Sequence, residues 1–474
     1  LSILSVAHVD DWGDNGACSF VDRTTGFYQS GGRIEWTGGT VSNVGGYGLV
    51  NNGGAAQLSG LTIDANACAG IINFFGAARV ENGLFTNGGG DGSSALMAAY
   101  VDYSGGSTIL TGNRFEANRV DYEYESSYTS GDNTYTTAYH DVNGYDVFAS
   151  SASSVEISDN EFVGGHTAVL FSETTGVLEN NVFDDYTGFF GYILSSDLEG
   201  ASNSFSNGTG RGIYASSSSV ELEDTELTGL SLREYTYDSY VNGELVTEGQ
   251  TTTAYGRAFE MYDSSLSLDG ATISDTITNP FYMYSSTGAV YELVDVTLNN
   301  VNTDASRSYY GAVYLAGYYG THDLYLENFV ANDIQNDAAI EIFNLNSGSY
   351  DGVVTLTIRG AEINNAQGRG MYLYGAGVTA DLEDVTINTT GSDGIYAYDG
   401  ALTLSNVDIS GADTSGFVFT NAAVSATTSS ATENGSYGMT CSGSTTIDDC
   451  DAIDLSLNDL GESLGCEAAC GVPL

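Results

Sequence analysis

The chain has 474 residues, of which 42% are hydrophobic, and its 33 tyrosines and many β-branched residues exclude a long disordered polymer. It contains 62 acidic residues against 11 basic ones, all of them arginine, and the formal net charge is −51. A surface of this sign repels nucleic acids and anionic membranes, and no apolar run approaches the ~18 residues of a transmembrane helix. We therefore expect no nucleic-acid partner and no transmembrane segment.

Residues 1–25 precede the first repeat and are predicted to form an N-terminal cap region. The segment HVDDWGDNG brings Asp10, Asp11 and Asp14 close together in sequence. Ca²⁺ binds several oxygen ligands that converge from a short loop, so this segment is a candidate calcium site. The alternative is a solvated acidic turn.

From residue 26 to residue 440 the chain repeats one unit. The segments GIYASSSSVELEDTELTG, from Gly212, and GIYAYDGALTLSNVDISG, from Gly394, align over 18 residues without a gap. Apolar residues alternate with polar ones in both, which is the period of a β-strand, and Gly, Asn, Asp and Ser interrupt the pattern where turns are expected. One unit cannot bury its apolar face alone, so we predict that successive units stack on each other.

A second repeat, Asn-x-Phe, supports the first. In a coil whose turns lie above one another, the asparagines would form one hydrogen-bonded column and the phenylalanines a second column in a dry interior. The motif occurs four times, with the residues Asn113, Phe115, Asn160, Phe162, Asn181, Phe183, Asn203 and Phe205.

These motifs resemble those of the right-handed parallel β-helix repeat proteins, the pectate-lyase-like superfamily. The resemblance covers nearly the whole chain and implies an all-β fold, a single right-handed parallel β-helix of about sixteen rungs. The two prolines of the sequence fit this prediction, because a parallel ladder uses the backbone N–H that proline lacks.

Two insertions interrupt the repeats, at residues 120–144 and 234–256. Each alternates Tyr or Thr with polar residues around a central turn, which predicts two β-hairpins that project from the same corner of the coil. Exposed aromatic rings pack against sugars or protein surfaces, although the hairpins could instead pack on each other or on the coil. The candidate binding residues are Tyr122, Tyr124, Tyr128, Tyr135, Tyr235, Tyr237 and Tyr240.

Arg211 and Arg257 each lie close to the start of a repeat, near the second hairpin. They are candidates for contact with an anion or a carboxylated sugar. The alternative is an ion pair with a nearby carboxylate such as Glu234 or Glu260, and the excess of acidic residues favours it.

The resemblance also implies possible activity on acidic polysaccharides, as a lyase or glycosidase. The sequence contains one N-T-D motif, at 302–304, but neither G-H-G nor R-I-K, and its acidic pair Asp184 and Asp185 precedes the N-T-D motif instead of following it. No catalytic residue is assigned, and Asp184 and Asp185 remain a weak alternative.

The C-terminal residues 441–474 contain four of the six cysteines and are predicted to form a second cap region. Proximity in sequence predicts the disulfides Cys18–Cys68, Cys441–Cys450 and Cys466–Cys470, which implies an oxidising compartment. The segment IDDCDAID provides a second candidate calcium site, with Asp448, Asp449 and Asp451.

Together these features predict a secreted or cell-surface protein that is structural or adhesive and not catalytic. We expect it to associate with itself, for instance into filaments, or with an extracellular glycan or protein through the tyrosine-rich hairpins. No cofactor is expected, with the possible exception of Ca²⁺. The alternatives are a polysaccharide-active enzyme and a glycan-binding module.

Overall fold

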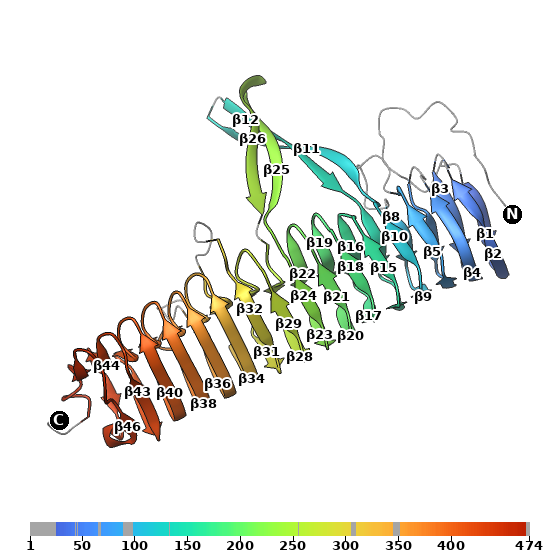
Figure 1. Ribbon diagram of the computed structural model, residues 1–474. Helices are drawn as coiled ribbons and strands as arrows, with labels where there is room; N and C mark the ends of the chain where they lie inside the picture. Colours follow the sequence, from blue (N-terminus) through green and yellow to red (C-terminus); the bar gives the residue numbers. More distant parts are fainter. Residues whose placement is uncertain are drawn as a thin grey trace. The chain divides into compact units, whose positions relative to one another are not determined.

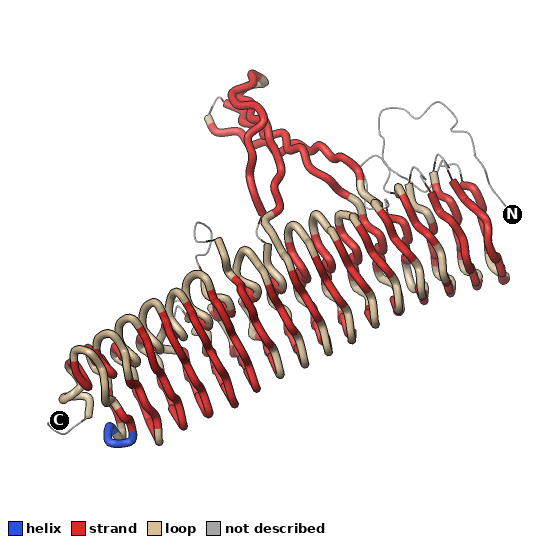
Figure 2. The backbone as a smooth tube through the Cα atoms, viewed as in Figure 1, coloured by secondary structure: helices blue, strands red, loops and turns tan. Residues whose placement is uncertain are grey.

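The structure is a computed structural model that describes residues 25–42, 44, 46–64, 68–88, 98–131, 133–254, 256–304, 310–344 and 351–470. Its contacts divide the chain into two units. Unit 1 comprises Leu1–Tyr214 and Leu230–Gly256, and unit 2 comprises Ala215–Gly229 and Arg257–Leu474. In both units the described backbone is almost entirely strand and turn (Figure 1, Figure 2).

Unit 1 is a coil whose strands form two parallel sheets. The first sheet contains β1 (Thr25–Ser30), β3 (Tyr47–Asn52), β5 (Ile71–Phe74), β8 (Ala98–Tyr103), β13 (Tyr145–Ser150), β16 (Thr167–Ser172) and β19 (Phe189–Leu194). The second contains β2 (Arg33–Ser42), β4 (Ala55–Asp64), β6 (Ala77–Glu81), β7 (Leu84–Thr86), β9 (Ser107–Thr111), β10 (Arg114–Glu116), β14 (Ser154–Ser158), β15 (Glu161–Val163), β17 (Thr175–Glu179), β18 (Val182–Asp184), β20 (Asp197–Ala201) and β21 (Ser204–Ser206). Strand β22 (Arg211–Ser216) spans the boundary between the units in sequence.

Unit 2 repeats this plan. Its first parallel sheet contains β27 (Phe259–Tyr262), β30 (Phe281–Ser285), β33 (Val313–Gly317), β35 (Ile340–Phe343), β37 (Met371–Tyr374), β39 (Ile395–Tyr398), β41 (Phe417–Thr420), β44 (Tyr437–Ser442) and β47 (Gly461–Leu464). Its second contains β23 (Ser219–Glu223), β24 (Glu226–Thr228), β28 (Ser265–Asp269), β29 (Thr272–Ser274), β31 (Ala289–Val294), β32 (Thr297–Val301), β34 (Thr321–Ile334), β36 (Val353–Ala366), β38 (Val378–Thr390), β40 (Ala401–Ala412), β42 (Ala423–Thr427), β43 (Ser429–Thr432), β45 (Thr446–Ile447) and β46 (Ile453–Asp454).

The predicted all-β parallel coil is therefore confirmed. The pairing continues through β47, so the cysteine-rich segment predicted as a cap also contributes strands to the coil. Only one short helix occurs among the described residues, the 3₁₀ turn η1 (Cys450–Ala452). Nothing in the described part of the chain has the helical length and apolar composition that a membrane span would require.

Phenylalanine rings form a continuous stack inside unit 1. The ring centroids of Phe115, Phe162, Phe183 and Phe205 follow one another at 4.8, 4.7 and 4.6 Å, and all four side chains are buried. Phe85 extends the stack, with its ring 4.6 Å from that of Phe115. The predicted column is confirmed, because parallel in-register strands place each Phe directly above the next.

The predicted asparagine column is confirmed as well. The side-chain amide of Asn113 donates to Asn160 at 3.0 Å, and the same contact recurs from Asn160 to Asn181 and from Asn181 to Asn203 at 3.1 Å. Each asparagine also donates to a backbone carbonyl of a preceding turn, for instance Asn181 to Ile157 at 2.9 Å. The column thus satisfies polar groups that the turns would otherwise bury without partners.

The left-handed turns of the coil explain why the sequence is rich in Asn and Asp. In unit 1, Asn82, Asp159 and Asn180 have φ of 53°, 56° and 54°, each between two short strands of the second sheet. Asn and Asp tolerate this conformation better than other residues with a side chain, and a β-branched residue would be strained there.

Candidate functional site

The two insertions form one four-stranded antiparallel sheet in unit 1, which we call the hairpin sheet (Figure 1). The first hairpin is β11 (Val120–Ser130) with β12 (Asn133–Asn143), and the second is β25 (Arg233–Val241) with β26 (Glu244–Ala254). Strands β12 and β25 pair with each other, from Tyr135 opposite Val241 to His140 opposite Thr236. The two predicted hairpins are present, and they pack on each other.

One face of the hairpin sheet, the tyrosine face, is lined with aromatic rings. Tyr124 stacks on Tyr139 at 4.8 Å and Tyr128 stacks on Tyr135 at 5.0 Å, in each case across the β11–β12 pair. The ring of Tyr139 lies 6.0 Å from the rings of both Tyr235 and Tyr237. Tyr128 is the most open of these, with 66% of its surface exposed. The alternation of strand residues thus places most of the predicted tyrosines on one side.

The opposite face of the hairpin sheet carries acidic residues and threonines, and one histidine on this face contacts both hairpins. His140 on β12 contacts Glu123 on β11 at 3.0 Å and Asp238 on β25 at 3.2 Å, so it joins both hairpins. Asp238 and then Glu123 raise the pKa of His140 by hydrogen bonding, which favours the protonated ring. The pKa of Asp238 is lowered, first by the backbone N–H of Gly249 and then by His140.

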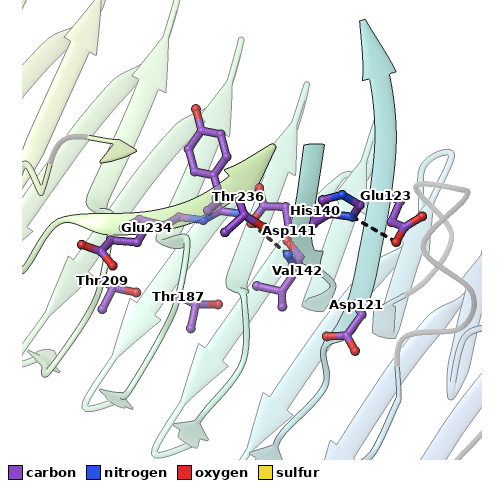
Figure 3. Close-up of a pocket in the computed structure, with 11 residues that line it drawn as sticks. Asp121, Glu123, His140, Asp141, Val142, Thr187, Thr209, Glu234 and Thr236 are labelled. Carbon is purple, nitrogen blue, oxygen red and sulfur yellow. Dashed lines mark hydrogen bonds and ion pairs between the residues drawn. The ribbon is translucent and has the colours of Figure 1, made fainter. Parts of the chain in front are cut away.

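A cavity of about 540 Å³ lies where the hairpins meet the coil of unit 1 (Figure 3). Arg233 lines the cavity and forms an ion pair with Asp141, and it also donates to the carbonyl of Val142 at 3.2 Å. Both charged side chains are only 14% exposed. The remaining lining residues are mostly acidic or carry a hydroxyl group: Asp121, Glu123, His140, Thr187, Thr209, Glu234, Tyr235 and Thr236.

His166 is buried close to this cavity and is neutral. Its Nδ1 lies 3.3 Å from Oγ1 of Thr187, and a Cβ atom at Gly188 would overlap its ring, so only glycine fits there. Burial, followed by the positive charges of Arg233 and Arg119, lowers the pKa of His166 to about 3. This histidine fills space at the junction and carries no charge at ordinary pH.

The cavity holds no recognisable catalytic set. Both ring nitrogens of His140 contact carboxylates, which raises the pKa of the ring and leaves neither nitrogen open to a substrate. The single arginine is neutralised by Asp141. What remains is a recess lined by carboxylates and hydroxyl groups, between the hairpin sheet and the coil of unit 1.

Two of the predicted binding residues, Tyr240 and Arg211, do not belong to the tyrosine face. Tyr240 lies on the acidic face, because it is adjacent in sequence to Ser239, which pairs with Thr137 on the tyrosine side. The guanidinium of Arg211 lies over the rings of Phe189 and Tyr214, at 5.5 and 5.9 Å. The side chain of Tyr122 lies outside the described residues, although its backbone pairs with Asp141.

Arg257 is not a surface binding residue, and that prediction was wrong. Its guanidinium is buried, forms an ion pair with Glu260 at 3.0 Å and covers the ring of Tyr282 at 3.8 Å. The alternative considered from the sequence, pairing with Glu260, is the observed one. A buried guanidinium needs a fixed carboxylate partner, because an unpaired buried charge is costly.

Asp184 and Asp185 stabilise a turn of the coil. Asp184 accepts hydrogen bonds from Ser206 and Asn207, both at 2.8 Å, and Asp185 adopts a left-handed conformation with φ of 57°. Neither residue lines the cavity beneath the hairpin sheet.

The predicted calcium sites gain no support from the described residues. Asp10, Asp11 and Asp14 lie outside the described part of the chain. Asp449 accepts from the backbone N–H of Asp451 and caps η1, and no group of three or more metal-binding side chains converges anywhere in the described ranges. Asp448 and Asp451 therefore belong to a turn and not to an evident metal site.

The C-terminal disulfide pairing differs from the prediction. The bonds are Cys441–Cys466 and Cys450–Cys470, with Cα separations of 4.8 and 5.8 Å. Cys68 is also disulfide-bonded, and its predicted partner Cys18 lies outside the described residues. The reason is the coil: β44 pairs with β47, so residues one turn apart are closer in space than cysteines nearby in sequence.

Several functional residues escaped the sequence analysis. Tyr139 is the centre of the tyrosine face, His140 joins the hairpins, and the Arg233–Asp141 ion pair is a second contact between them. Tyr139 follows the alternation that begins at Tyr135, so the period of two could have found it. The contacts of His140, Arg233 and Asp141 depend on the pairing of β12 with β25. These two strands are about a hundred residues apart in sequence, so the contacts could not be predicted from a local pattern.

The sequence matches no protein-family model and no curated protein.

Proposed function

We propose that this is an extracellular structural or adhesive protein without catalytic activity, in which the coil is a scaffold and the tyrosine face of the hairpin sheet is the contact surface. The observation that carries the proposal is the projection of a four-stranded sheet with at least five tyrosines on one face, in which Arg233 of β25 and Asp141 of β12 join the two hairpins by an ion pair. The cysteines support the extracellular location, since all of those described are disulfide-bonded.

Tyrosine suits a contact surface for physical reasons. Its ring buries a large apolar area with little loss of conformational freedom, while the hydroxyl group can still hydrogen-bond. The stacking of Tyr124 on Tyr139 and of Tyr128 on Tyr135 fixes the rings before a partner arrives, which reduces the entropic cost of binding. We propose a glycan or an extracellular protein as the partner.

The test is to immobilise the full chain and measure its binding to panels of polysaccharides and extracellular matrix proteins. Replacing Tyr124 and Tyr128 by Ser should weaken binding to any ligand found by about tenfold or more, as for other interface tyrosines. The matched control is Tyr28→Ser on the coil of unit 1, where the tyrosine is 55% exposed. Equal binding by all three proteins would reject the tyrosine face as the contact surface.

A second candidate function is action on, or recognition of, a polysaccharide by unit 2. Its first sheet carries a column of polar and aromatic residues that follow in register, and three of them, Glu260, Tyr314 and Glu341, are buried. The column also contains Tyr282 and Tyr372. Desolvation raises the pKa of Glu341 to about 7, a value suited to a general acid. We also propose that the chain is a right-handed coil of the pectate-lyase-like superfamily, which it resembles in its repeated Asn-x-Phe columns.

Product release from a polysaccharide panel tests the second candidate. Activity that is lost in Glu341→Gln and retained in Asp184→Asn would establish it. The absence of products from every acidic and neutral polysaccharide would leave the adhesive function as the better explanation.

A further inference from the structure

We propose that two copies of this chain associate through the edge strand β11, which pairs antiparallel with β11 of the second copy to form an eight-stranded sheet. This inference rests on the proposed function, because it makes a second copy one partner of the hairpin sheet. It also names the strand, the register and the symmetry of the contact.

The hairpin sheet has two outer strands, β11 and β26, and each pairs with one neighbour only among the described strands. Residues 123–130 of β11 and 244–251 of β26 are exposed throughout. An edge strand presents a row of backbone donors and acceptors that another strand can satisfy. Lysine, the residue that commonly protects such edges, does not occur in the sequence.

The two edge strands differ in how regularly they pair with their neighbours. Strand β11 keeps an unbroken register with β12 over all eleven residues, from Val120 to Ser130. Strand β26 shifts its register against β25 twice, near Tyr237 to Ser239 and Ser239 to Tyr240. Bulges bend and twist a strand and so discourage further pairing, which leaves β11 as the edge that can accept another strand.

Charge selects the register. A two-fold axis perpendicular to the sheet places one residue of β11 opposite the same residue in the second copy. Every residue that precedes the axis then lies opposite the residue that follows the axis by the same number of positions. An axis at Glu125 would oppose two carboxylates, which is unfavourable. An axis at Ser126 places Glu125 opposite Ser127 of the second copy and Glu123 opposite Thr129, so no acidic residue faces another.

The same register continues the tyrosine face. With the axis at Ser126, Tyr124 faces Tyr128 of the second copy, and the symmetry generates the pair twice. Both rings already stand on the tyrosine face of their own sheet and are exposed. Cross-strand aromatic pairs are among the more stabilising contacts in antiparallel sheets. An axis at Ser127 also separates the carboxylates, but it opposes Tyr128 to Ser126 and forms no tyrosine pair.

The charge of the chain makes this association dependent on salt. Each copy has a formal net charge of −51, and Asp121, Glu123 and Glu125 lie on the pairing strand itself. Mutual repulsion opposes the approach of two copies at low ionic strength and is screened at higher salt. We therefore expect the dimer to gain population as NaCl rises, the reverse of an association driven by opposite charges.

Single-cysteine variants of the full chain test both the contact and its register. Ser126→Cys should form an intermolecular disulfide with oxidised glutathione in high salt, because the two Cβ atoms would face each other across the axis at about 5 Å. Ser127→Cys should crosslink much less. The control is Ser219→Cys, an exposed serine on β23 of unit 2. Sedimentation velocity of the unmodified chain should show the dimer fraction rise with NaCl.

The outcomes are distinct. Ser126→Asp should weaken the dimer by roughly fivefold, because two carboxylates would then oppose each other, while Ser219→Asp should not. A chain that stays monomeric at every salt concentration, with no excess crosslinking at position 126, overturns this inference; a partner that still binds the tyrosine face would then uphold the proposed function alone. Stronger crosslinking at 127 than at 126 overturns the proposed register.

Discussion

Asp102 ends a column of buried side-chain amides in unit 1. Asn51 donates to Asn73 at 2.7 Å, and Asn73 donates to Asp102 at 3.3 Å, while the other carboxylate oxygen of Asp102 accepts from Thr108 at 2.6 Å. Asp102 thus occupies a position where an asparagine would fit. Desolvation raises its pKa to about 6, which means that the ionised form is held at a cost.

We predict that Asp102→Asn stabilises unit 1 at pH 8. The folded pKa is above the ordinary value of 3.8, so the native stability contributed by this group is complete below about pH 4 and is lost as the pH rises through 6. A shift of about two pH units corresponds to roughly 3 kcal/mol, and we expect a gain of about 1–3 kcal/mol in the free energy of unfolding at pH 8. Denaturant unfolding at pH 8 and pH 4 measures it.

The matched control for this prediction is Asp197→Asn, an exposed position at the start of β20. It should leave the free energy of unfolding within about 0.5 kcal/mol of the original at both pH values. If Asp102→Asn lowers the free energy of unfolding at pH 8, the prediction is wrong, and a carboxylate stabilises the end of the column more than an amide does.

At the scale of the element, His140 should make the hairpin junction sensitive to pH. Because Asp238 and Glu123 raise its pKa, the stability that His140 contributes is complete below its ordinary pKa of about 6.5 and is lost as the pH rises through the higher folded value. We expect the amides of β12 and β25 to show larger hydrogen-exchange protection factors near pH 6 than near pH 9.

His140→Gln should remove this dependence on pH, while the protection of the coil strands stays unchanged. Thr236, directly opposite His140 on β25, offers a control, because Thr236→Ser keeps the strand pair and the imidazole. Protection factors for the β12–β25 amides that are the same at both pH values in the original chain would contradict the prediction.

The elements also show what the sequence could and could not predict. The phenylalanine and asparagine columns followed from the repeat, since a fixed number of residues per turn sets which side chains stack. The hairpins followed from alternation, but their mutual pairing did not, because β12 and β25 are joined through space by long-range contacts. The disulfide error has the same origin: Cys441 and Cys466 are 25 residues apart, about one turn, and stacking governs their distance.

At the scale of the whole chain, charge dominates. Of the eleven arginines, Arg33, Arg79, Arg114, Arg233, Arg257, Arg359 and Arg369 form ion pairs with carboxylates of the chain itself. The 62 acidic residues far exceed the 11 arginines, so most of the negative charge of the chain is not balanced by arginine. The protein is expected to avoid polyanions and to concentrate cations around its surface.

Thermal unfolding followed over salt and pH tests this view of the chain. Repulsion among like charges destabilises the folded state, so each unfolding transition should move up by several degrees between about 20 mM and 500 mM NaCl. Acidification from pH 8 should also stabilise the chain, since burial raises the pKa values of Asp146 and Glu341 to about 7 and that of Asp102 to about 6. The stability contributed by these three carboxyl groups is lost as the pH rises through those values.

His166 limits the gain at acidic pH. Its pKa of about 3 is far below the ordinary 6.5, so its contribution is lost as the pH falls below 6.5, when the unfolded chain binds a proton that the folded chain excludes. Between about pH 7 and pH 4 the three carboxyl groups bind more protons in the folded chain and outweigh the single proton that His166 excludes, so Tm should rise as the pH falls and reach its maximum near pH 4. A Tm that rises steadily from pH 5 to pH 9, or that falls on addition of salt, would show that neither the buried carboxyl groups nor the net charge governs the stability of this chain.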